Sequence, residues 1–365
     1  MNEFQKRIEQ FAKRMKQEHI DASILFDQSH IRYFSGFIVN QVTESVLIIE
    51  SDGTVSYLVP RLDFYRAERD CWIEKIESFL EDTPDYLAPL RKIVNKNWQK
   101  IGIEQNIITV RHLSYIKDIC KGNLTSVDLL LEDQMKIKSE WEIANLRQAA
   151  NIASLTMDET KRYISENTGV TEREASGYAK YIMNKNGAEN VSFEPFIMSG
   201  LDAALPRRIS TNKVLTEGEL ILFDMGCIYN GYCSDITRTF SLGQVSDKQK
   251  EVFEIALEAQ KKAVKAIKPG EHVQTIDAIA RDYITEHGYG EYFPHLTGHG
   301  LGMAVHEYPI LDQGEKSILQ KNMIVTIEPG VYMPGVGAAR MEDMILVTDS
   351  GYEYLTTSSR VLLLK

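Results

Sequence analysis

The sequence is poor in cysteine and has no long hydrophobic run. Its four cysteines show none of the paired spacings that are typical of metal sites. No stretch approaches the roughly 18 apolar residues of a transmembrane helix, and no signal peptide is recognisable. These absences disfavour a membrane protein and predict reduced thiols in a cytoplasmic protein.

An excess of positive charge is also missing. The chain has 41 basic and 52 acidic residues, and its net charge of −11 disfavours nucleic acids and anionic membranes as partners. With 43% apolar and 25% charged residues, its composition is that of an ordinary globular protein. Its 365 residues are enough for two domains.

The first part of the chain mixes helical and strand patterns. Residues 4–18 carry apolar side chains at helical spacing. Strand patterns occupy 22–27, 45–50, 55–60 and 100–105. This alternation predicts an α/β domain over residues 1–130. Ser139 and Glu142 then form a capping-box pattern that predicts a helix start, so we expect the second domain to cover residues 131–365.

The second part has the pattern of an α+β domain. The expected helices are 139–163, 171–187, 246–268 and 273–287, and the expected strand pairs lie near 219–242, 322–334 and 339–348. The helix at 246–268 again begins with a capping box, at Ser246 and Gln249.

One strand pair, "FDMGCIYNGYCSDITRTF" at residues 223–240, has an unusual composition. Asn230 and Gly231 separate two alternating runs, which is the strongest short-range signal for a hairpin with a type I′ turn. If these two residues form the loop, Tyr229 pairs with Tyr232. Each arm of this hairpin also carries an aspartate where a half-buried strand favours apolar residues.

The predicted register brings the two aspartates together. It sets Gly226 opposite Asp235, so Asp224 and Asp235 become diagonal neighbours on one face, about 7–8 Å apart at the backbone. Two sheltered carboxylates at this distance repel each other, and one of them must hold a proton or both must share a cation. A metal is the simpler explanation if further ligands exist.

Further candidate ligands occur downstream. The stretch "HLTGHGLGMAVHEYP" supplies His295, His299 and His306, while "VTIEPGVYMPG" and "AARMEDMILV" supply Glu328 and Glu342. Four carboxylates and one imidazole suit two divalent cations of the manganese, cobalt or zinc type. Paired cations can activate water and polarise a carbonyl.

Each candidate also has an ordinary structural interpretation. A single aspartate in a strand is usually an edge or turn residue, and a single histidine on an apolar face is usually a hydrogen-bonded core residue. Glu342 and Asp343 are also compatible with a surface acidic pair. Five candidates in strand or glycine-flanked contexts favour the metal site.

The motifs "LILFDMG…GYCSDITRTF", "TGHGLG…VHEYP", "IEPGVY" and "ARMEDMILV" resemble, in order and spacing, the M24 metallopeptidases. This family includes Xaa-Pro dipeptidases (prolidases), aminopeptidase P and methionine aminopeptidases. "HIRYFSGF" and "MKIKSEWEIANLRQAANIA" are similar to the N-terminal domain and linking helix of bacterial prolidases and aminopeptidases P. The methionine aminopeptidase branch, which usually lacks such a domain, is therefore disfavoured.

The resemblance implies a creatinase/prolidase-like N-terminal domain and a C-terminal pita-bread domain. By the same resemblance, the metal ligands are Asp224, Asp235, His299, Glu328 and Glu342, with Asp235 and Glu342 bridging both ions. Glu328 is implied as an acid/base on the attacking water.

Four further site residues follow from the resemblance. His306 is implied to donate a hydrogen bond to the scissile carbonyl, His295 to line the substrate pocket, and Arg340 to orient neighbouring acids or substrate. Arg207 stands where the family usually has an active-site histidine. It could pair with a free substrate carboxylate, block the usual substrate, or be an ordinary surface arginine.

The functional hypothesis is metal-dependent hydrolysis of the Xaa–Pro bond, first of all in dipeptides. Aminopeptidase P activity on Xaa-Pro-Yaa peptides is the alternative within the class. A creatinase-like hydrolase and a non-enzymatic binding protein are the alternatives outside it. Expected partners are short proline-containing peptides, and the resemblance implies a homodimer. Manganese is the first choice of metal, with cobalt, zinc or iron as alternatives.

Overall fold

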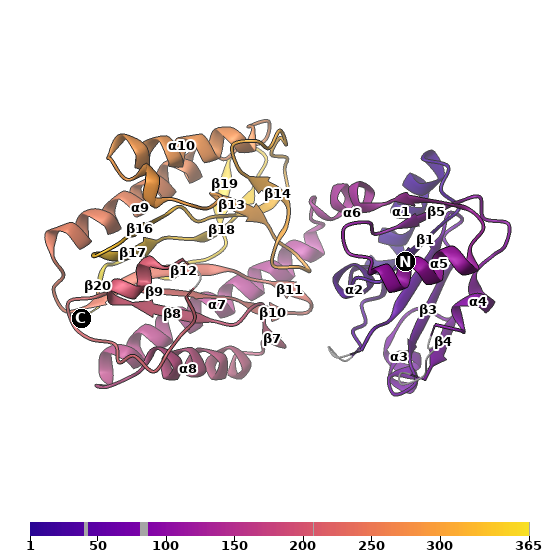
Figure 1. The fold of residues 1–365 in the computed structure, drawn as a ribbon, viewed down its shortest axis with the longest axis horizontal. Helices are drawn as coiled ribbons and strands as arrows, with labels where there is room; N and C mark the ends of the chain where they lie inside the picture. The colour runs from indigo at the N-terminus through magenta and orange to yellow at the C-terminus, as the bar shows by residue number, and fades with distance from the viewer. Residues whose placement is uncertain (40–42, 81–86, 207, 365) are drawn as a thin grey trace. The chain divides into compact units, whose positions relative to one another are not determined.

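The structure is a computed structural model that describes residues 1–39, 43–80, 87–206 and 208–364. Arg207, predicted at the mouth of the site, lies outside the described residues. Contacts within the chain define two compact units, Met1–Met135 and Lys136–Lys365. They are called the first and the second unit below (Figure 1).

The first unit is built on a six-stranded mixed sheet with the strand order β4-β3-β2-β1-β5-β6. Its strands are β1 (Ala22–Leu25), β2 (Val46–Glu50), β3 (Val55–Pro60), β4 (Ile76–Phe79), β5 (Lys100–Ile103) and β6 (Asn123–Ser126). Its helices are α1 (Glu3–Gln17), α2 (Gln28–Ser35), α3 (Phe64–Asp70), α4 (Leu90–Ile93), α5 (Val110–Ile119) and α6 (Asp128–Met135). The predicted α/β class is confirmed, and the four predicted strands are β1, β2, β3 and β5.

The second unit places sheets of mostly antiparallel strands between two pairs of helices (Figure 1). The helices are α7 (Glu140–Glu166), α8 (Glu172–Lys185), α9 (Asp247–Lys265) and α10 (Val273–Glu286), with short 3-10 turns η1 (Gly200–Ala204) and η2 (Gly290–Tyr292). Each of the four helices was expected from the sequence. The side chains of Ser139 and Ser246 cap α7 and α9 in the predicted capping boxes.

The strands of the second unit form four sheets. One contains β20-β12-β9-β8, a second β14-β13-β15-β18-β19, a third β11-β10-β7, and the last β16-β17. Their bounds are β7 (Asn190–Val191), β8 (Phe196–Ser199), β9 (Leu220–Met225), β10 (Cys227–Tyr229), β11 (Tyr232–Cys233), β12 (Ile236–Leu242), β13 (Gly298–Gly300), β14 (Glu307–Leu311), β15 (Ile324–Ile327), β16 (Gly330–Met333), β17 (Gly337–Arg340), β18 (Asp343–Val347), β19 (Tyr352–Tyr354) and β20 (Leu363–Leu364). The predicted α+β character is confirmed.

The element order of the second unit contains one arrangement twice. A helix pair, α7 and α8, precedes the antiparallel pairing of β9 with β12, and a second pair, α9 and α10, precedes the pairing of β15 with β18. Each helix pair packs on its own strands through a separate apolar cluster. The faces of the strands that point away from these helices are therefore free to carry polar groups.

The predicted hairpin is present. Tyr229 pairs with Tyr232, and Asn230 and Gly231 have φ values of 47° and 85°, as a type I′ turn requires. At Gly226 the two arms come so close that a Cβ atom there would lie 1.9 Å from the carbonyl oxygen of Ser234. Only glycine fits this approach.

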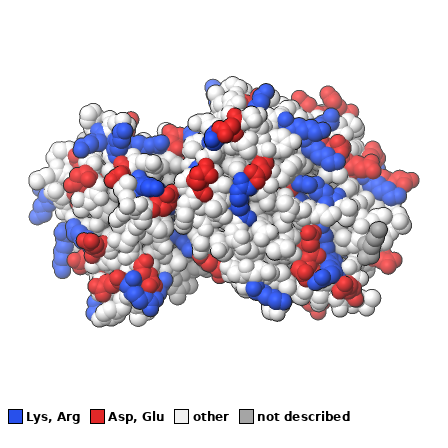
Figure 2. Space-filling model, turned by 180° about the vertical axis from the view of Figure 1, so that it is seen from behind, with Lys and Arg blue, Asp and Glu red and all other residues white. Residues whose placement is uncertain are grey.

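The surface and the thiols agree with an ordinary globular protein. No helix in the described part of the chain is long and apolar enough to cross a membrane. Basic and acidic side chains are interspersed on the face shown in Figure 2. The four cysteines are free thiols, and three of them are buried.

Replacing Gly226 with alanine should destabilise the second unit by about 1–3 kcal/mol, because the added methyl group forces the hairpin arms apart. Calorimetric unfolding should show a lower Tm for this unit. Gly177→Ala is the matched control, because Gly177 lies in α8 with open space around its Cβ position. That change should stabilise by about 0.5–1 kcal/mol. An unchanged Tm in Gly226→Ala would contradict the close approach.

Candidate metal centre

The first strand ladder of the second unit brings Asp224 and Asp235 to one face. Ile221, Phe223 and Met225 of β9 belong to the apolar cluster under α7 and α8. Because strand side chains alternate, Asp224 points away from these helices. The register pairs Asp224 with Thr237, and continuing it by two residues sets Asp235 beside them on the same face, as the sequence predicted.

The second ladder contributes the two glutamates. β15 pairs with β18 as far as Ile327 and Asp343, and β16 pairs with β17 in the same register beyond them. Continuing this register through the intervening residues sets Glu328 opposite Glu342. The sequence left this register open, because the loop after β16 contains glycine.

Direct hydrogen bonds join the two ladders. The backbone N–H of Glu342 donates to the carbonyl oxygen of Thr237 over 3.1 Å, and the Thr237 hydroxyl donates to Glu342 Oε2 over 2.6 Å. The backbone N–H of Arg340 donates to the Thr239 hydroxyl over 3.0 Å. All four carboxylates thus belong to one interior surface.

His299 approaches this surface from β13. The carbonyl oxygen of Gly300 lies 2.9 Å from Nδ1 and accepts its proton, so Nε2 is the ring nitrogen that faces the acids. Nε2 lies 3.2 Å from Glu328 Oε1 and 3.7 Å from Asp235 Oδ2. Imidazole nitrogen and carboxylate oxygen are common ligands of zinc and manganese.

The donor set fits a divalent cation. One potential ligand atom each from Asp235, His299 and Glu342 lie within 4.8 Å of one another. In addition, Asp224 Oδ1, Asp235 Oδ1 and Glu342 Oε1 are buried without a hydrogen-bond partner among the described residues. Buried polar atoms are normally satisfied, and carboxylate oxygens without a donor are the atoms that a cation would bind.

The pKa values show how strongly the cluster disfavours its own negative charge. Burial raises the pKa of Asp224 to about 6. Burial, followed by the charges of neighbouring carboxylates, raises the pKa of Asp235 and of Glu342 well above the usual value. Burial also acts to raise the pKa of Glu328, but the hydrogen bond and charge of His299 outweigh it and lower this pKa to about 2.

Arg340 brings a positive charge to this interior surface, because its guanidinium contacts the acids. Its Nη1 donates to the Tyr332 hydroxyl over 2.6 Å and its Nε to the Thr237 hydroxyl over 3.1 Å. Its Nη2 pairs with Asp224 Oδ2. This pairing orients Asp224 and leaves Oδ1 without a hydrogen-bond partner among the described residues.

The other two predicted histidines lie around the cluster. His295 is half-buried, its ring lies 5.4 Å from the ring of Tyr332, and its Nε2 has no hydrogen-bond partner among the described residues. His306 is exposed, and its ring lies 4.3 Å from the ring of His299. Both are placed where a molecule next to the acids would meet them.

Sequence reasoning missed two residues of this surface. Thr237 hydrogen-bonds both Glu342 and Arg340, and Tyr332 bonds Arg340. The hairpin register could have found Thr237, because it pairs directly with Asp224. Strand alternation beyond Glu328 could have found Tyr332.

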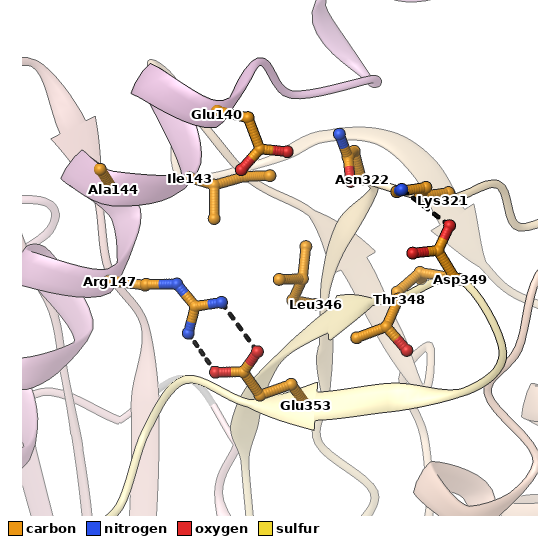
Figure 3. Close-up of a pocket in the computed structure, with 11 residues that line it drawn as sticks. Glu140, Ile143, Ala144, Arg147, Lys321, Asn322, Leu346, Thr348, Asp349 and Glu353 are labelled. Carbon is orange, nitrogen blue, oxygen red and sulfur yellow. Dashed lines mark hydrogen bonds and ion pairs between the residues drawn. The ribbon is translucent and has the colours of Figure 1, made fainter.

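A cavity of about 360 Å³ lies elsewhere in the second unit, between the start of α7 and the end of β18 (Figure 3). Four of its charged groups pair with one another, Arg147 with Glu353 and Lys321 with Asp349, and Glu140 also lines it. None of the predicted site residues lines it. It therefore offers no second centre for the chemistry of the acid cluster.

Comparisons with known proteins agree with this geometry. The model of metallopeptidase family M24 matches residues 144–349, and that of the creatinase/prolidase N-terminal domain matches residues 7–134. A Xaa-Pro dipeptidase of Pyrococcus horikoshii is 38% identical over 100% of this chain and 99% of its own length.

Two solved structures are similar along their whole length. The Xaa-Pro dipeptidase from Bacillus anthracis has a TM-score of 0.89 at 36% identity, covering 99% of this chain and 100% of that one. The X-Pro aminopeptidase from Thermotoga maritima has a TM-score of 0.84 at 32% identity, covering 96% and 100%. Fold and matches define a metallopeptidase with a pita-bread domain. The chain belongs to metallopeptidase family M24.

The raised pKa values predict how the metal-free protein responds to pH. The pKa of Asp224 rises from its usual 3.8 to about 6, so the folded state holds this proton more tightly than the unfolded state. The resulting stability is fully present at a pH below the usual pKa of Asp224, and it is lost as the pH rises through the pKa of the folded state. Asp235 and Glu342 extend the loss to higher pH. In EDTA, the Tm should therefore fall as the pH rises from about 4 through about 6, and it should continue to fall above that pH.

The variant Asp235→Asn tests the origin of this loss. In EDTA near pH 8 it should be more stable than wild type, because one buried charge is gone. With excess Mn²⁺ the order should reverse, because the variant lacks a ligand. Parallel pH profiles of Tm for the two proteins in EDTA would contradict the assigned repulsion.

Proposed function

We propose that this protein hydrolyses the Xaa–Pro bond of dipeptides with the help of two divalent cations. The observation that carries the proposal is the buried cluster of four carboxylates and one imidazole, in which three carboxylate oxygens lack a donor among the described residues. The full-length similarity to a Xaa-Pro dipeptidase supports the choice of substrate.

The proposed ligands are Asp224, Asp235, His299, Glu328 and Glu342. Asp235 and Glu342 would be shared by the two ions, in keeping with their oxygen atoms that lack donors among the described residues. When bound, the cations supply activation of water and polarisation of the scissile carbonyl. We propose manganese, although cobalt, zinc and iron accept the same donors.

Glu328 is the proposed proton carrier. The hydrogen bond and charge of His299 outweigh burial and lower its pKa, so that the carboxylate is ionised at neutral pH, and we assign it to accept a proton from the attacking water. It then delivers this proton to the proline nitrogen that leaves. The Thr326 hydroxyl donates to Glu328 Oε1 over 3.1 Å and holds the carboxylate in position for both transfers.

The substrate contacts fall to residues around the cluster. His306 is exposed beside His299, and we assign it to the oxygen of the scissile carbonyl, which gains negative charge in the transition state. His295 offers a buried Nε2 to the substrate. Arg340 acts through Asp224, which it orients. The role of Arg207 stays a prediction.

Two properties of the proposal concern the protein as a whole. We propose a homodimer on the resemblance to bacterial prolidases, and a cytoplasmic location on the free thiols. The partners are short peptides with proline in the second position. Proline has no backbone N–H, and its ring fixes its φ angle. Cleavage of the bond before proline therefore calls for a dedicated site.

Aminopeptidase P activity is the second candidate. It is favoured by the full-length similarity to the X-Pro aminopeptidase from Thermotoga maritima. The ratio of kcat/KM for a Xaa-Pro-Yaa tripeptide to that for the matching Xaa-Pro dipeptide decides between the two. A ratio below one supports the dipeptidase, and a ratio above one the aminopeptidase.

The central test is hydrolysis of Xaa-Pro dipeptides in the presence of Mn²⁺ or Co²⁺. Asp235→Asn should lower kcat/KM at least about 100-fold, because a bridging ligand is lost and with it several kcal/mol of transition-state stabilisation. The released proline is measured directly. Equal activity of variant and wild type would overturn the assignment.

His306→Ala should lower kcat about 100- to 1,000-fold, the usual loss of one oxyanion donor. Its affinity for Mn²⁺, measured by titration calorimetry, should stay that of wild type. His287→Ala is the control, because His287 is an exposed histidine at the end of α10 and its loss should leave kcat unchanged. A rise in KM alone, without a fall in kcat, would contradict the role of His306.

A further inference from the structure

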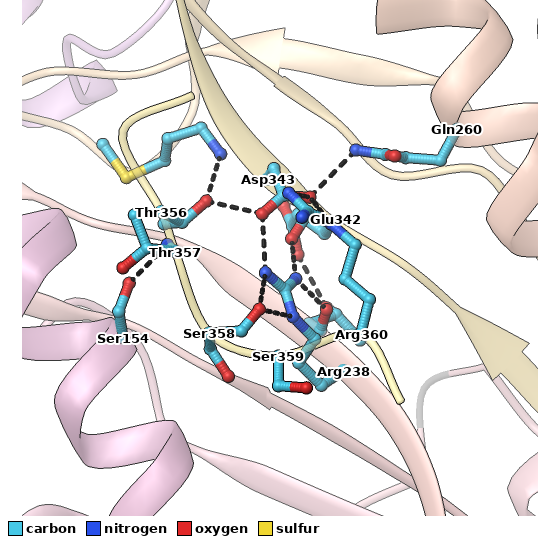
Figure 4. A network of polar contacts seen from close by, with 12 residues as sticks. Ser154, Arg238, Gln260, Glu342, Asp343, Thr356, Thr357, Ser358, Ser359 and Arg360 are labelled. Atoms are coloured by element: carbon cyan, nitrogen blue, oxygen red, sulfur yellow. Dashed lines mark hydrogen bonds and ion pairs between the residues drawn. The ribbon is translucent and has the colours of Figure 1, made fainter. Parts of the chain in front are cut away.

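A buried ion pair lies behind the acid cluster (Figure 4). Arg238 and Asp343 are 1% and 0% exposed in their side chains, and Arg238 Nη2 lies 2.6 Å from Asp343 Oδ1. Each residue directly follows a residue of the cluster, Thr237 in one case and Glu342 in the other. Because strand side chains alternate, Arg238 and Asp343 point away from the acids.

The Arg238 guanidinium binds the main chain that carries the cluster. Its Nη1 donates to the carbonyl oxygen of Glu342 over 2.5 Å and to that of Thr237 over 2.9 Å. Its Nε and Nη2 donate to the carbonyl oxygen of Ser358 over 3.1 and 3.0 Å. One rigid group thus fixes β12, the residue before β18 and a later segment together.

Asp343 is held equally firmly. Its Oδ1 accepts from Arg238 and, over 2.7 Å, from the Thr356 hydroxyl. Its Oδ2 accepts from Gln260 Nε2 over 2.9 Å and from Arg360 Nη2 over 2.8 Å. Gln260 lies in α9, so the same carboxylate connects the second helix pair to the strand that begins after Glu342.

Stability alone gives little reason for such a pair. Burying two charges costs desolvation energy, and apolar residues of similar volume often stabilise a fold as well or better. The contacts of this ion pair instead fix the position of Glu342. The backbone of Glu342 is fixed by Arg238, and its side chain is fixed by Thr237.

We propose that Arg238 and Asp343 are positioning residues for the metal centre, which hold the Glu342 carboxylate at the distance from Asp235 that lets both share the cations. This inference rests on the proposed metal ligands and goes beyond them. Neither residue contacts the substrate or the ions. Both act through the backbone at Glu342.

The test is the affinity for Mn²⁺, measured by titration calorimetry on the whole protein, together with Tm in EDTA and in Mn²⁺. Arg238→Met should weaken Mn²⁺ binding about 10- to 100-fold, the usual loss when a group that orients a ligand is removed. Arg238→Lys should rescue little of it, because an ammonium group cannot reach all of these acceptors at once. Wild-type affinity in either variant overturns the inference.

Arg7→Met is the matched control. Arg7 is a buried arginine of the first unit that donates to the carbonyl oxygen of Tyr33 over 2.7 Å. Its loss should lower Tm without changing the Mn²⁺ affinity. An equal weakening of Mn²⁺ binding in Arg7→Met and Arg238→Met would show a general effect of instability and overturn the inference.

A milder variant guards against a failure of Arg238→Met to fold. Arg360→Met removes two hydrogen bonds to Asp343 Oδ2, from Nε and from Nη2, while Gln260 still bonds the same oxygen. Mn²⁺ binding should weaken about two- to tenfold, and unchanged binding overturns the inference. The two proposals can fail separately. If the wild type cleaves no Xaa-Pro peptide, the proposed function is overturned. If the same protein still binds Mn²⁺ at least tenfold more tightly than Arg238→Met, the positioning role is supported.

Discussion

Mutual repulsion among four sheltered carboxylates is the constraint around which the second unit is arranged. Asp224, Asp235, Glu328 and Glu342 come from two strand ladders, and each ladder is held by its own pair of helices. Arg340 offsets part of their charge through Asp224. Protons can relieve the remaining repulsion, as the raised pKa values of Asp235 and Glu342 indicate, and so can the cations proposed above.

Much of this arrangement was readable from the sequence. Asn230 and Gly231 admit a two-residue turn, and that turn determines which residues of the first ladder face each other. The helix starts were equally clear, because Ser139 and Ser246 carry complete capping boxes. Each of these signals depends on residues that are close in the sequence, so the packing of the rest of the chain does not change the structure that they predict.

What the sequence could not predict depends on contacts between distant segments. β4 and β6 were missed because they are the edges of their sheet and contain few apolar residues. The register of the second ladder was open because its glycine-containing loop admits several turns. The partners of Arg238 lie more than a hundred positions along the chain, at Glu342, Asp343 and Ser358, and no spacing rule links them.

The network around Asp343 also bears on biosynthesis. Glu342, and with it Thr356 and Arg360 that bond the neighbouring Asp343, leave the ribosome long after Asp224 and Asp235. The half-made chain therefore exposes an acidic hairpin that lacks its counterpart. A nascent polypeptide of this kind holds only part of the acid cluster, and the cluster is complete only after translation has passed Glu342.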